Sequence, residues 1–249
     1  MKDKNSISII TVAFNSEKTI KETLESVRNQ ITKPNQYIIV DGGSTDMTLS
    51  ILQDYSDIIT DIISEKDDGI YDAMNKGLSL VNCDIVGFLN SDDTYIDKYV
   101  LDRVKSSFEE GVKIFCGGIN YVDSSGFIKR EWLLRDSRNN IQGGWHPPHP
   151  GFFCKNSLYQ KLGNFNLDYK IAADFDLMIR FILSNMTEIK IYPYPLVNMK
   201  LGGASNVSLK NILIGNKDVR TSLKSLGFNV GFFYTIRRMF SKLIQKSKS

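Results

Sequence analysis

Apolar and amphipathic segments alternate four times within about the first 90 residues of the chain. The apolar runs are short and rich in β-branched residues, as expected of strands that are buried on both faces of a sheet. They cover residues 6–13, 37–41, 58–63 and 85–89. Strands and helices in alternation build a parallel sheet with helices on both faces. The pattern therefore predicts an α/β fold with a mostly parallel, doubly wound sheet.

The segments between these strands have the apolar spacing of helices. In the first of them the apolar positions recur every three to four residues, at Ile20, Leu24, Val27 and Ile31. We expect Asn15 and Ser16 to cap this helix and Pro34 to end it. Two further helices are predicted on the same grounds, around residues 49–55 and 70–81.

The composition of the 249-residue chain is that of an ordinary globular protein, with 42% hydrophobic and 24% charged residues. It excludes a disordered, collagen-like or disulfide-stapled protein. Three widely spaced cysteines and two histidines argue against a structural zinc site and favour a reducing compartment. No run reaches the roughly 18 apolar residues of a membrane-spanning helix. We also expect no secretory signal, because the N-terminal apolar run is short.

Acidic residues stand where two of the predicted strands end. Asp41 closes the second strand, and Asp92 and Asp93 follow the fourth. Ligands of open parallel sheets bind beyond the carboxyl ends of the strands, so these carboxylates are candidate ligand-binding groups. One acid in such a place is also a common helix cap. A pair of acids, with a third on a neighbouring strand, favours ligand binding.

The loop after the first strand lacks the glycine-rich signatures of common nucleotide-binding folds. It reads Phe14-Asn15-Ser16-Glu17-Lys18, and the chain has neither G-x-G-x-x-G there nor a G-x-x-x-x-G-K-[ST] motif. The charge of a nucleotide diphosphate would then need another partner. Carboxylates that hold Mg²⁺ or Mn²⁺ serve that purpose, and Asp92 and Asp93 fit it.

An ordered set of segments through residues 6–206 resembles the family-2 glycosyltransferases of the GT-A fold. The resemblance is to the bacterial polysaccharide-assembly type, which includes colanic-acid, O-antigen and capsule enzymes. The matching segments are residues 8–15, 39–46, 64–77 (SEKDDGIYDAMNKG), 88–93, 149 with 152–153, 172–176 and 201–205. Any one of these motifs is weak, whereas their order and spacing together are specific.

This resemblance implies an enzyme, a metal-dependent hexosyl- or N-acetylhexosaminyltransferase that uses a nucleotide-sugar donor, a UDP-sugar foremost. The residues implied in donor binding are Thr11, Val12, Ala13, Phe14, Asp41, Lys76, Asn90 and Asp92. Asp41 would accept a hydrogen bond from a uracil N–H, and Asp92 would lie near the ribose. Asp93 would bind the Mn²⁺ or Mg²⁺ ion that bridges the diphosphate.

The segment around Lys76 departs from the broader family pattern. Met74 stands where an arginine is common, and Asp68 stands where an asparagine is common. The cation that contacts the donor phosphates is therefore not identified by the resemblance. Lys76 is a candidate, and the alternative is a solvated lysine on a helix.

The alternation of strands and helices changes from about residue 113, where two predicted strands, at 113–119 and 127–134, flank a turn. A long loop rich in glycine and proline follows and contains Trp145 and His149. Loops of this length are often functional. Trp145 would either face a sugar or lipid head group or plug the loop onto the body of the protein. His149 is placed at the active site by the resemblance, although a lone histidine is often structural.

Asp174 falls in the first turn of a predicted helix whose apolar face continues to residue 182. A carboxylate there would stabilise the helix dipole. The resemblance implies instead a general base that deprotonates an acceptor hydroxyl during a single inverting displacement. Ala173 replaces the glutamate of the family's Glu-Asp pair, so Asp174 is the remaining carboxylate. Asp176 should point elsewhere on the helix.

Charge is distributed unevenly along the chain. Residues 210–249 hold nine basic side chains and one acid, a charge of +8, which leaves −5 for residues 1–209. Residues 230–248 have the pattern of a basic amphipathic helix that lies in a membrane interface. The alternative is a helix docked on the protein's own core. No nucleic-acid reader motif is present, so we expect no nucleic-acid partner.

The predicted organisation is a glycosyltransferase domain at 1–206, with a nucleotide-sugar half at 1–112 and an acceptor half at 113–206, followed by a basic helical tail at 207–249. We expect the acceptor to be a lipid-diphosphate-linked saccharide at the inner face of the bacterial cytoplasmic membrane. Two other classes stay open: an inactive nucleotide-sugar-binding protein and a membrane-associated scaffold.

Overall fold

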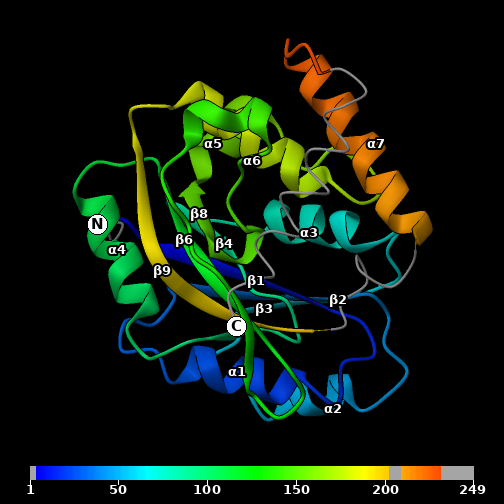
Figure 1. The fold of residues 1–249 in the computed structure, drawn as a ribbon. Coiled ribbons are helices and arrows are strands. Elements are labelled where there is room, and N and C mark those ends of the chain that lie inside the picture. Colours follow the sequence, from blue (N-terminus) through cyan, green and yellow to red (C-terminus); the bar gives the residue numbers. More distant parts are fainter. Residues whose placement is uncertain (1–3, 202–208, 231–249) are drawn as a thin grey trace.

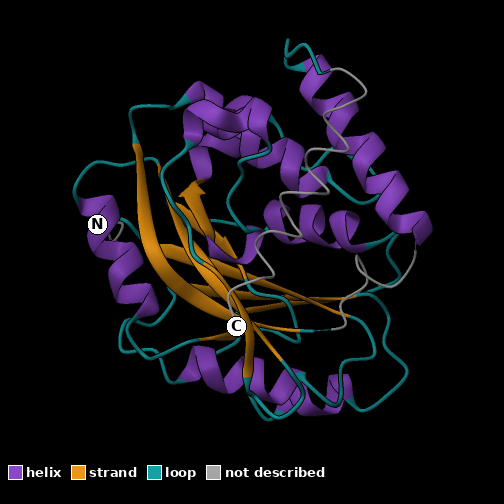
Figure 2. Cartoon of the chain, in the orientation of Figure 1, coloured by secondary structure: helices purple, strands orange, loops and turns teal. Residues whose placement is uncertain are grey.

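The computed structural model describes residues 4–201 and 209–230. One curled sheet of nine strands lies between two layers of helices (Figures 1 and 2). Hydrogen-bonded neighbours follow the order β3-β2-β1-β4-β8-β6-β9-β5, and β7 pairs with the far end of β6. The predicted α/β class is confirmed, and the sheet is mixed rather than wholly parallel.

The first half of the chain forms the parallel part of the sheet, as its alternating pattern predicts. Pairing of β1 with β2 and β4, and of β2 with β3, is parallel throughout. The elements are β1 (Ile7–Ala13), α1 (Ile20–Arg28), β2 (Gln36–Asp41), α2 (Thr48–Gln53), β3 (Asp61–Ser64), α3 (Ile70–Ser79) and β4 (Ile85–Phe88).

The limits of the first helix differ from the prediction. Helix α1 begins at Ile20 and ends at Arg28, before Pro34, and Ile31 is 55% exposed. Asn15 does not cap the helix, because it adopts a positive φ of 47° and its side chain bonds to the loop after β2. Ser16 likewise bonds to the loop after β4. Both side chains tie loops together instead of starting a helix.

The second half contains the two strands predicted at 113–119 and 127–134, as β6 and β7, and adds β8 and β9, which the sequence pattern did not reveal. Strand β8 lies antiparallel between β4 and β6, and β9 runs parallel to β6. The elements are β5 (Thr94–Tyr95), α4 (Val100–Glu109), β6 (Ile114–Val122), β7 (Ile128–Trp132), β8 (Phe152–Lys155), α5 (Asn156–Leu162), α6 (Ala173–Ser184), β9 (Ile189–Lys200) and α7 (Leu209–Ser225). Two short 3₁₀ turns, Arg138–Gly143 and His149–Gly151, occupy the predicted long loop.

Each face of the sheet has its own apolar core. Alternate residues of β1 point to opposite faces, so Ile10 belongs to the core formed with residues of α3, α5, α6 and α7, whereas Ile9 belongs to the core formed with residues of α1, α2 and α4. Helix α3 approaches the sheet closely at Gly77, where an added Cβ would lie 2.6 Å from a methyl carbon of Ile10. The absence of a side chain there sets the depth at which α3 lies.

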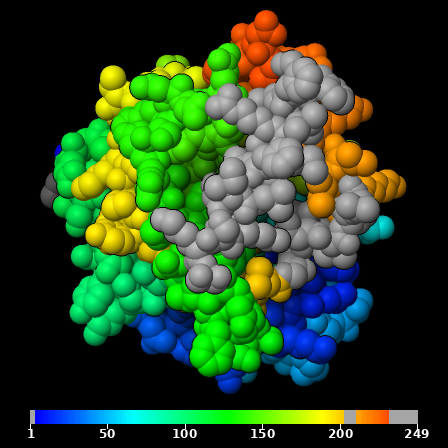
Figure 3. All heavy atoms as spheres, in the orientation of Figure 1, coloured from blue at the N-terminus to red at the C-terminus, as the bar shows by residue number. Residues whose placement is uncertain are grey.

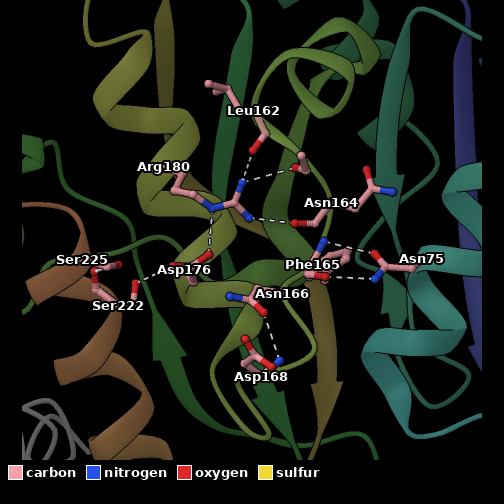
Figure 4. A network of polar contacts seen from close by, with 11 residues as sticks. Asn75, Leu162, Asn164, Phe165, Asn166, Asp168, Asp176, Arg180, Ser222 and Ser225 are labelled. Carbon is pink, nitrogen blue, oxygen red and sulfur yellow. Dashed lines mark hydrogen bonds and ion pairs between the residues drawn. The ribbon is translucent and has the colours of Figure 1, made fainter.

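A buried ion pair fastens α6 to its neighbours (Figure 4). Asp176, 4% exposed, accepts hydrogen bonds from Arg180 Nε at 2.7 Å and from Ser222 Oγ of α7 at 2.7 Å. The Arg180 guanidinium also donates to the carbonyls of Leu162 and Asn164, at 2.5 and 2.7 Å. Asp176 therefore points away from Asp174, as the sequence predicts, and links α6 to α7.

Part of the predicted tail lies in α7, whereas the amphipathic segment 230–248 lies, apart from Val230, outside the described residues. Among the residues that the structure describes, no helix combines the length and the apolar character needed to cross a bilayer. The predicted boundaries near residues 113 and 207 stay predictions.

Asp176→Ala should lower the free energy of unfolding by about 2–4 kcal/mol, because Arg180 would lose its only described carboxylate partner and keep only carbonyl acceptors. Chemical denaturation measures this difference. The matched control is Asp97→Ala, which breaks the more exposed Asp97–Arg103 pair and should cost about 1 kcal/mol or less. Equal losses for the two variants would contradict the structural importance of the buried pair.

Candidate active site

Three loops that follow parallel strands meet at the carboxyl edge of the sheet. Asn15, after β1, is bonded to the loop after β2: its N–H donates to Ser44 Oγ at 2.8 Å, and its Oδ1 accepts from the Thr45 N–H at 2.9 Å. Ser16 Oγ lies 2.8 Å from Ser91 Oγ in the loop after β4. These bonds bring the loops that carry Asp41 and Asp93 to one edge, as the parallel pattern predicts.

Asp41 is completely buried, and donors from its surroundings satisfy its carboxylate. Oδ2 accepts from the N–H groups of Gly43 and Ser44, at 3.2 and 3.0 Å, and from Ser64 Oγ at 2.7 Å. Oδ1 accepts from the Ser44 hydroxyl. Asp41 therefore organises the loop after β2. Oδ1 has one described partner, whereas Oδ2 has three.

The predicted base-pocket residues of β1 occupy different environments. Thr11 is fully buried and lies 3.1 Å from the Tyr37 hydroxyl, so its side chain belongs to the core. Val12 and Ala13 are also buried, on opposite faces of the sheet. Phe14 is 63% exposed, and its ring lies beside Gly42. Phe14 is therefore the one side chain of this group that offers a free surface.

Asp93 is buried without a full set of hydrogen-bond donors. It is 1% exposed, and its Oδ2 accepts from Asn90 Nδ2 at 3.2 Å. Its Oδ1 has no hydrogen-bond partner among the described residues, and neither has Asn90 Oδ1. Burial, together with the charge of neighbouring Asp92, holds the pKa of the Asp93 carboxyl well above its ordinary value. Burial also raises the pKa of Asp92.

This arrangement fits a divalent cation. A bound cation would supply the partner that Asp93 Oδ1 lacks, and a second carboxylate, Asp92, is adjacent. The described residues contain no cluster of three or more His, Cys, Asp or Glu side chains able to hold a metal by themselves. An ion here would therefore need further ligands, such as diphosphate oxygens or water.

Asp174 lies in the first turn of α6 and contacts α3. Its Oδ1 is 3.0 Å from the Tyr71 hydroxyl, which also lies 2.8 Å from the carbonyl oxygen of Ile171. Asp174 is half-buried, so one side of the carboxylate stays open. Of the two acids on this turn, Asp174 is the one that faces α3.

His149 lies in an aromatic enclosure close to Asp174. Its ring is 5.2 Å from that of Phe88 and 5.6 Å from that of Phe165. Burial lowers the pKa of His149 below its ordinary value, and the charge of Asp174 opposes this shift. His149 is therefore expected to be a neutral imidazole at pH 7.

Two predicted residues have local partners. The Lys76 ammonium forms ion pairs with Glu65 and Asp72, at 2.9 and 3.4 Å, so it is engaged on the helix surface. The Trp145 indole N–H donates to the Arg135 carbonyl at 2.8 Å, and its ring packs on the apolar core. Of the two interpretations of Trp145, the structure favours the one in which this side chain fixes the loop to the body of the protein.

Sequence reasoning missed two residues beside the predicted ones. The sequence pattern did not single out Tyr71, because it occupies a helix position next to the apolar face. Lys200 ends β9, a strand that was not predicted. Its backbone N–H and its positive charge lower the pKa of Asp93, and its charge lowers the pKa of Asp92. The Lys200 ammonium also pairs with Glu22 at 2.8 Å. Lys200 is therefore a cation on β9 that acts on both carboxylates.

Comparison with known proteins gives a consistent picture. Residues 8–171 match the family model described as glycosyl transferase family 2. An uncharacterized glycosyltransferase of Mycobacterium tuberculosis is 31% identical over 180 residues, which are 71% of this chain and 69% of the relative. A PGL/p-HBAD biosynthesis glycosyltransferase of the same species is 27% identical over 213 residues, 80% of this chain and 78% of the relative.

Solved structures show the same fold at low sequence identity. The first 349 residues of Staphylococcus aureus TarS, in complex with UDP, align with a TM-score of 0.69 and 18% identity over 96% of this chain and 70% of theirs. The mannosyltransferase PcManGT of Pyrobaculum calidifontis, in complex with GDP-Man and Mn²⁺, aligns with a TM-score of 0.63 and 17% identity over 98% of this chain and 70% of its own.

Asp93→Asn should raise the thermal midpoint Tm at pH 7.5 in EDTA by a few degrees, where about 1 kcal/mol corresponds to about 2–4 °C. The raised pKa means that the folded state binds a proton more readily than the unfolded state. Stability is therefore lost as pH rises from about 4 through the folded pKa, and the substitution removes that loss.

Thermal scans at pH 4.5 and pH 7.5 test this expectation. The gain of Asp93→Asn over the parent protein should be larger at pH 7.5, and exposed Asp54→Asn should show no such pH dependence. An Asp93→Asn protein less stable than its parent at both pH values would contradict the cost assigned to this carboxylate.

Proposed function

The chain belongs to glycosyl transferase family 2, and from that premise we propose that it transfers a sugar from a UDP-sugar to a hydroxyl of a lipid-linked saccharide, with inversion at the anomeric carbon. The observation that carries the proposal is the presence of two carboxylates with unfilled hydrogen-bonding capacity. One is buried and short of a partner at Asp93, and the other is half-buried and open at Asp174.

Binding of the nucleotide is assigned to the edge formed by the loops after β1, β2 and β4. Asp41 Oδ1 is the proposed acceptor for the base, and the exposed ring of Phe14 is the surface on which the base stacks. The UDP complex of TarS, a protein of the same fold, supports a uridine nucleotide for this chain.

Asp93, with Asp92 beside it, is the residue proposed to hold Mn²⁺ or Mg²⁺. The metal would supply positive charge to the diphosphate that leaves the sugar. Lys200 is the protein cation placed to assist in this, because it already acts on both carboxylates. The Mn²⁺ complex of PcManGT supports a divalent cation as the cofactor.

Asp174 is the proposed general base. The acceptor hydroxyl gives its proton to the open side of the Asp174 carboxylate, and its oxygen attacks the anomeric carbon as the bond to the diphosphate breaks. A single displacement of this kind inverts the configuration. Neutral His149 adds no charge beside the base, and with Phe88 and Phe165 it encloses that side of the site.

The acceptor and the location of the enzyme are proposed from charge and exposure. Helix α7 carries exposed Lys217 and Lys224, and the side chain of Leu213, one turn before Lys217, is 70% exposed. In the space-filling view α7 (orange) forms the outer rim at the upper right (Figure 3). A basic face with an exposed apolar side chain suits an anionic membrane, where a lipid-diphosphate-linked acceptor resides. We accordingly propose a peripheral enzyme of the cytoplasmic membrane that acts in surface-polysaccharide assembly.

Asp174→Asn should lower kcat by about 10²–10⁴-fold, because the variant keeps the shape of the side chain and loses the base. The affinity for UDP in the presence of Mn²⁺, measured by titration calorimetry, should stay within about twofold. Transfer at the parental rate would show that another group is the base.

The donor is identified by screening UDP-Glc, UDP-Gal, UDP-GlcNAc, UDP-GalNAc and GDP-Man for Mn²⁺-dependent release of the nucleoside diphosphate. We expect release from at least one UDP-sugar, its loss in EDTA and its loss in Asp93→Asn. A protein that binds UDP and Mn²⁺ but releases nothing from any donor would instead be a nucleotide-sugar-binding protein.

A further inference from the structure

The backbone of a single residue, Ile171, connects three elements around the proposed base. The Ile171 N–H donates to Asp218 Oδ2 of α7 at 2.9 Å. Its carbonyl oxygen accepts from the Tyr71 hydroxyl of α3 at 2.8 Å. Helix α6, which carries Asp174, begins two residues later at Ala173. The backbone just before Asp174 is therefore held by α7 through the Ile171 N–H and by α3 through the Ile171 carbonyl.

The Tyr71 hydroxyl has one hydrogen and two acceptors. Ile171 O and Asp174 Oδ1 lie 2.8 and 3.0 Å from it, so the hydrogen is shared between the carbonyl and the carboxylate. Burial, reinforced by the charge of Asp174, raises the pKa of Tyr71 far above its ordinary value, so the phenol stays a donor. Any shift of the Ile171 carbonyl would change what Tyr71 gives to Asp174.

The ring of Tyr71 is itself fixed in place. It stacks on Phe165 at a centroid distance of 5.7 Å. The Phe165 backbone exchanges two hydrogen bonds with the Asn75 side chain, at 2.9 and 3.0 Å (Figure 4). Tyr71 and Asn75 both lie on α3, so the hydroxyl reaches Asp174 from a rigid support.

Helix α7 lies close to Ile171 and binds its N–H. Asp218 is 8% exposed, and its bond to Ile171 spans 47 positions of sequence. At Gly215, one turn before Asp218, an added Cβ would lie 3.0 Å from a methyl carbon of Ile171. The small residue brings α7 against this segment, so the carboxylate of Asp218 reaches the backbone N–H directly.

We propose that Tyr71 and Asp218 are positioning residues for the base: Asp218 fixes the backbone of Ile171, and Tyr71 orients the Asp174 carboxylate toward the acceptor hydroxyl. The proposal rests on the function proposed for Asp174. It makes α7 part of the catalytic apparatus, although none of its described side chains touches Asp174 in a described hydrogen bond or ion pair.

Tyr71→Phe keeps the stacked ring and removes the hydroxyl. Its kcat should fall about 10–100-fold, the size expected when a reacting group is misplaced. KM for the donor and the UDP affinity with Mn²⁺ should stay within about twofold. Asp218→Ala should lower kcat about tenfold or more. Asp218→Asn, which keeps an oxygen acceptor for the Ile171 N–H, should restore most of the lost rate.

The matched control is Ser222→Ala. It removes a buried hydrogen bond between α7 and α6, one that does not involve Ile171. Its Tm should fall, whereas its kcat below that Tm should stay within about twofold of the parent. If Ser222→Ala lowered kcat as much as Asp218→Ala does, general loosening of α7 would explain both, and the positioning role would be wrong.

A double-mutant cycle tests the proposal from a second side. If Tyr71 acts through Asp174, Tyr71→Phe should lower the rate of the parent but not the residual rate of Asp174→Asn. The two substitutions should also be non-additive in Tm, a readout that needs no donor. Additive effects in both measurements would show that Tyr71 does not act through Asp174.

The outcomes separate this proposal from the one on which it rests. If Asp174→Asn releases UDP from the donors named above at the parental rate, the base assignment itself fails. If Asp174→Asn is inactive while Tyr71→Phe and Asp218→Ala keep the parental kcat, the base stands and the positioning roles fail.

Discussion

Burying an ionised carboxylate is costly unless donors or a cation surround it, and three of the aspartates that this structure buries are accommodated in three different ways. Asp41 is surrounded by backbone and hydroxyl donors, and Asp176 is paired with Arg180 and Ser222. Asp93 alone among the three keeps an oxygen with no partner in the described chain. The first two carboxylates hold loops and helices in place. The third costs stability, which is the property expected of a group kept for a ligand.

The parallel half of the fold followed from the sequence because its signals are local. Apolar runs and helical spacing each span a few residues, and they located β1, β2, β4 and the helices between them. The first turn of α1 was misjudged because the side chains of Asn15 and Ser16 bond to distant loops rather than to the helix backbone. Strand β9 escaped notice because its pattern is irregular: it contains two prolines, and its pairing with β6 is broken by register shifts.

The residues of the candidate site also differ in whether the sequence could identify them. The acids at strand ends were identifiable because topology alone brings the carboxyl ends of parallel strands together, and Asp174 was identifiable only through a family resemblance. Tyr71 and Asp218 were not identifiable from sequence. Their contacts join residues 103 and 47 positions apart, and nothing in the local spacing of α3 or α7 indicates them. The polar contacts around the proposed base arise from tertiary packing, and the spacing of residues along the chain does not reveal them.

Strand β8 has a mechanical consequence. It is hydrogen-bonded to β4 on one side and to β6 on the other, so the strand that leads to Asp93 and the strands of the second half form one continuous sheet. A hinge between the two halves would have to break ladder hydrogen bonds on at least one side of β8. The carboxylates at the carboxyl edge are therefore carried by one continuous sheet, and α6, with the proposed base Asp174, packs on one face of it.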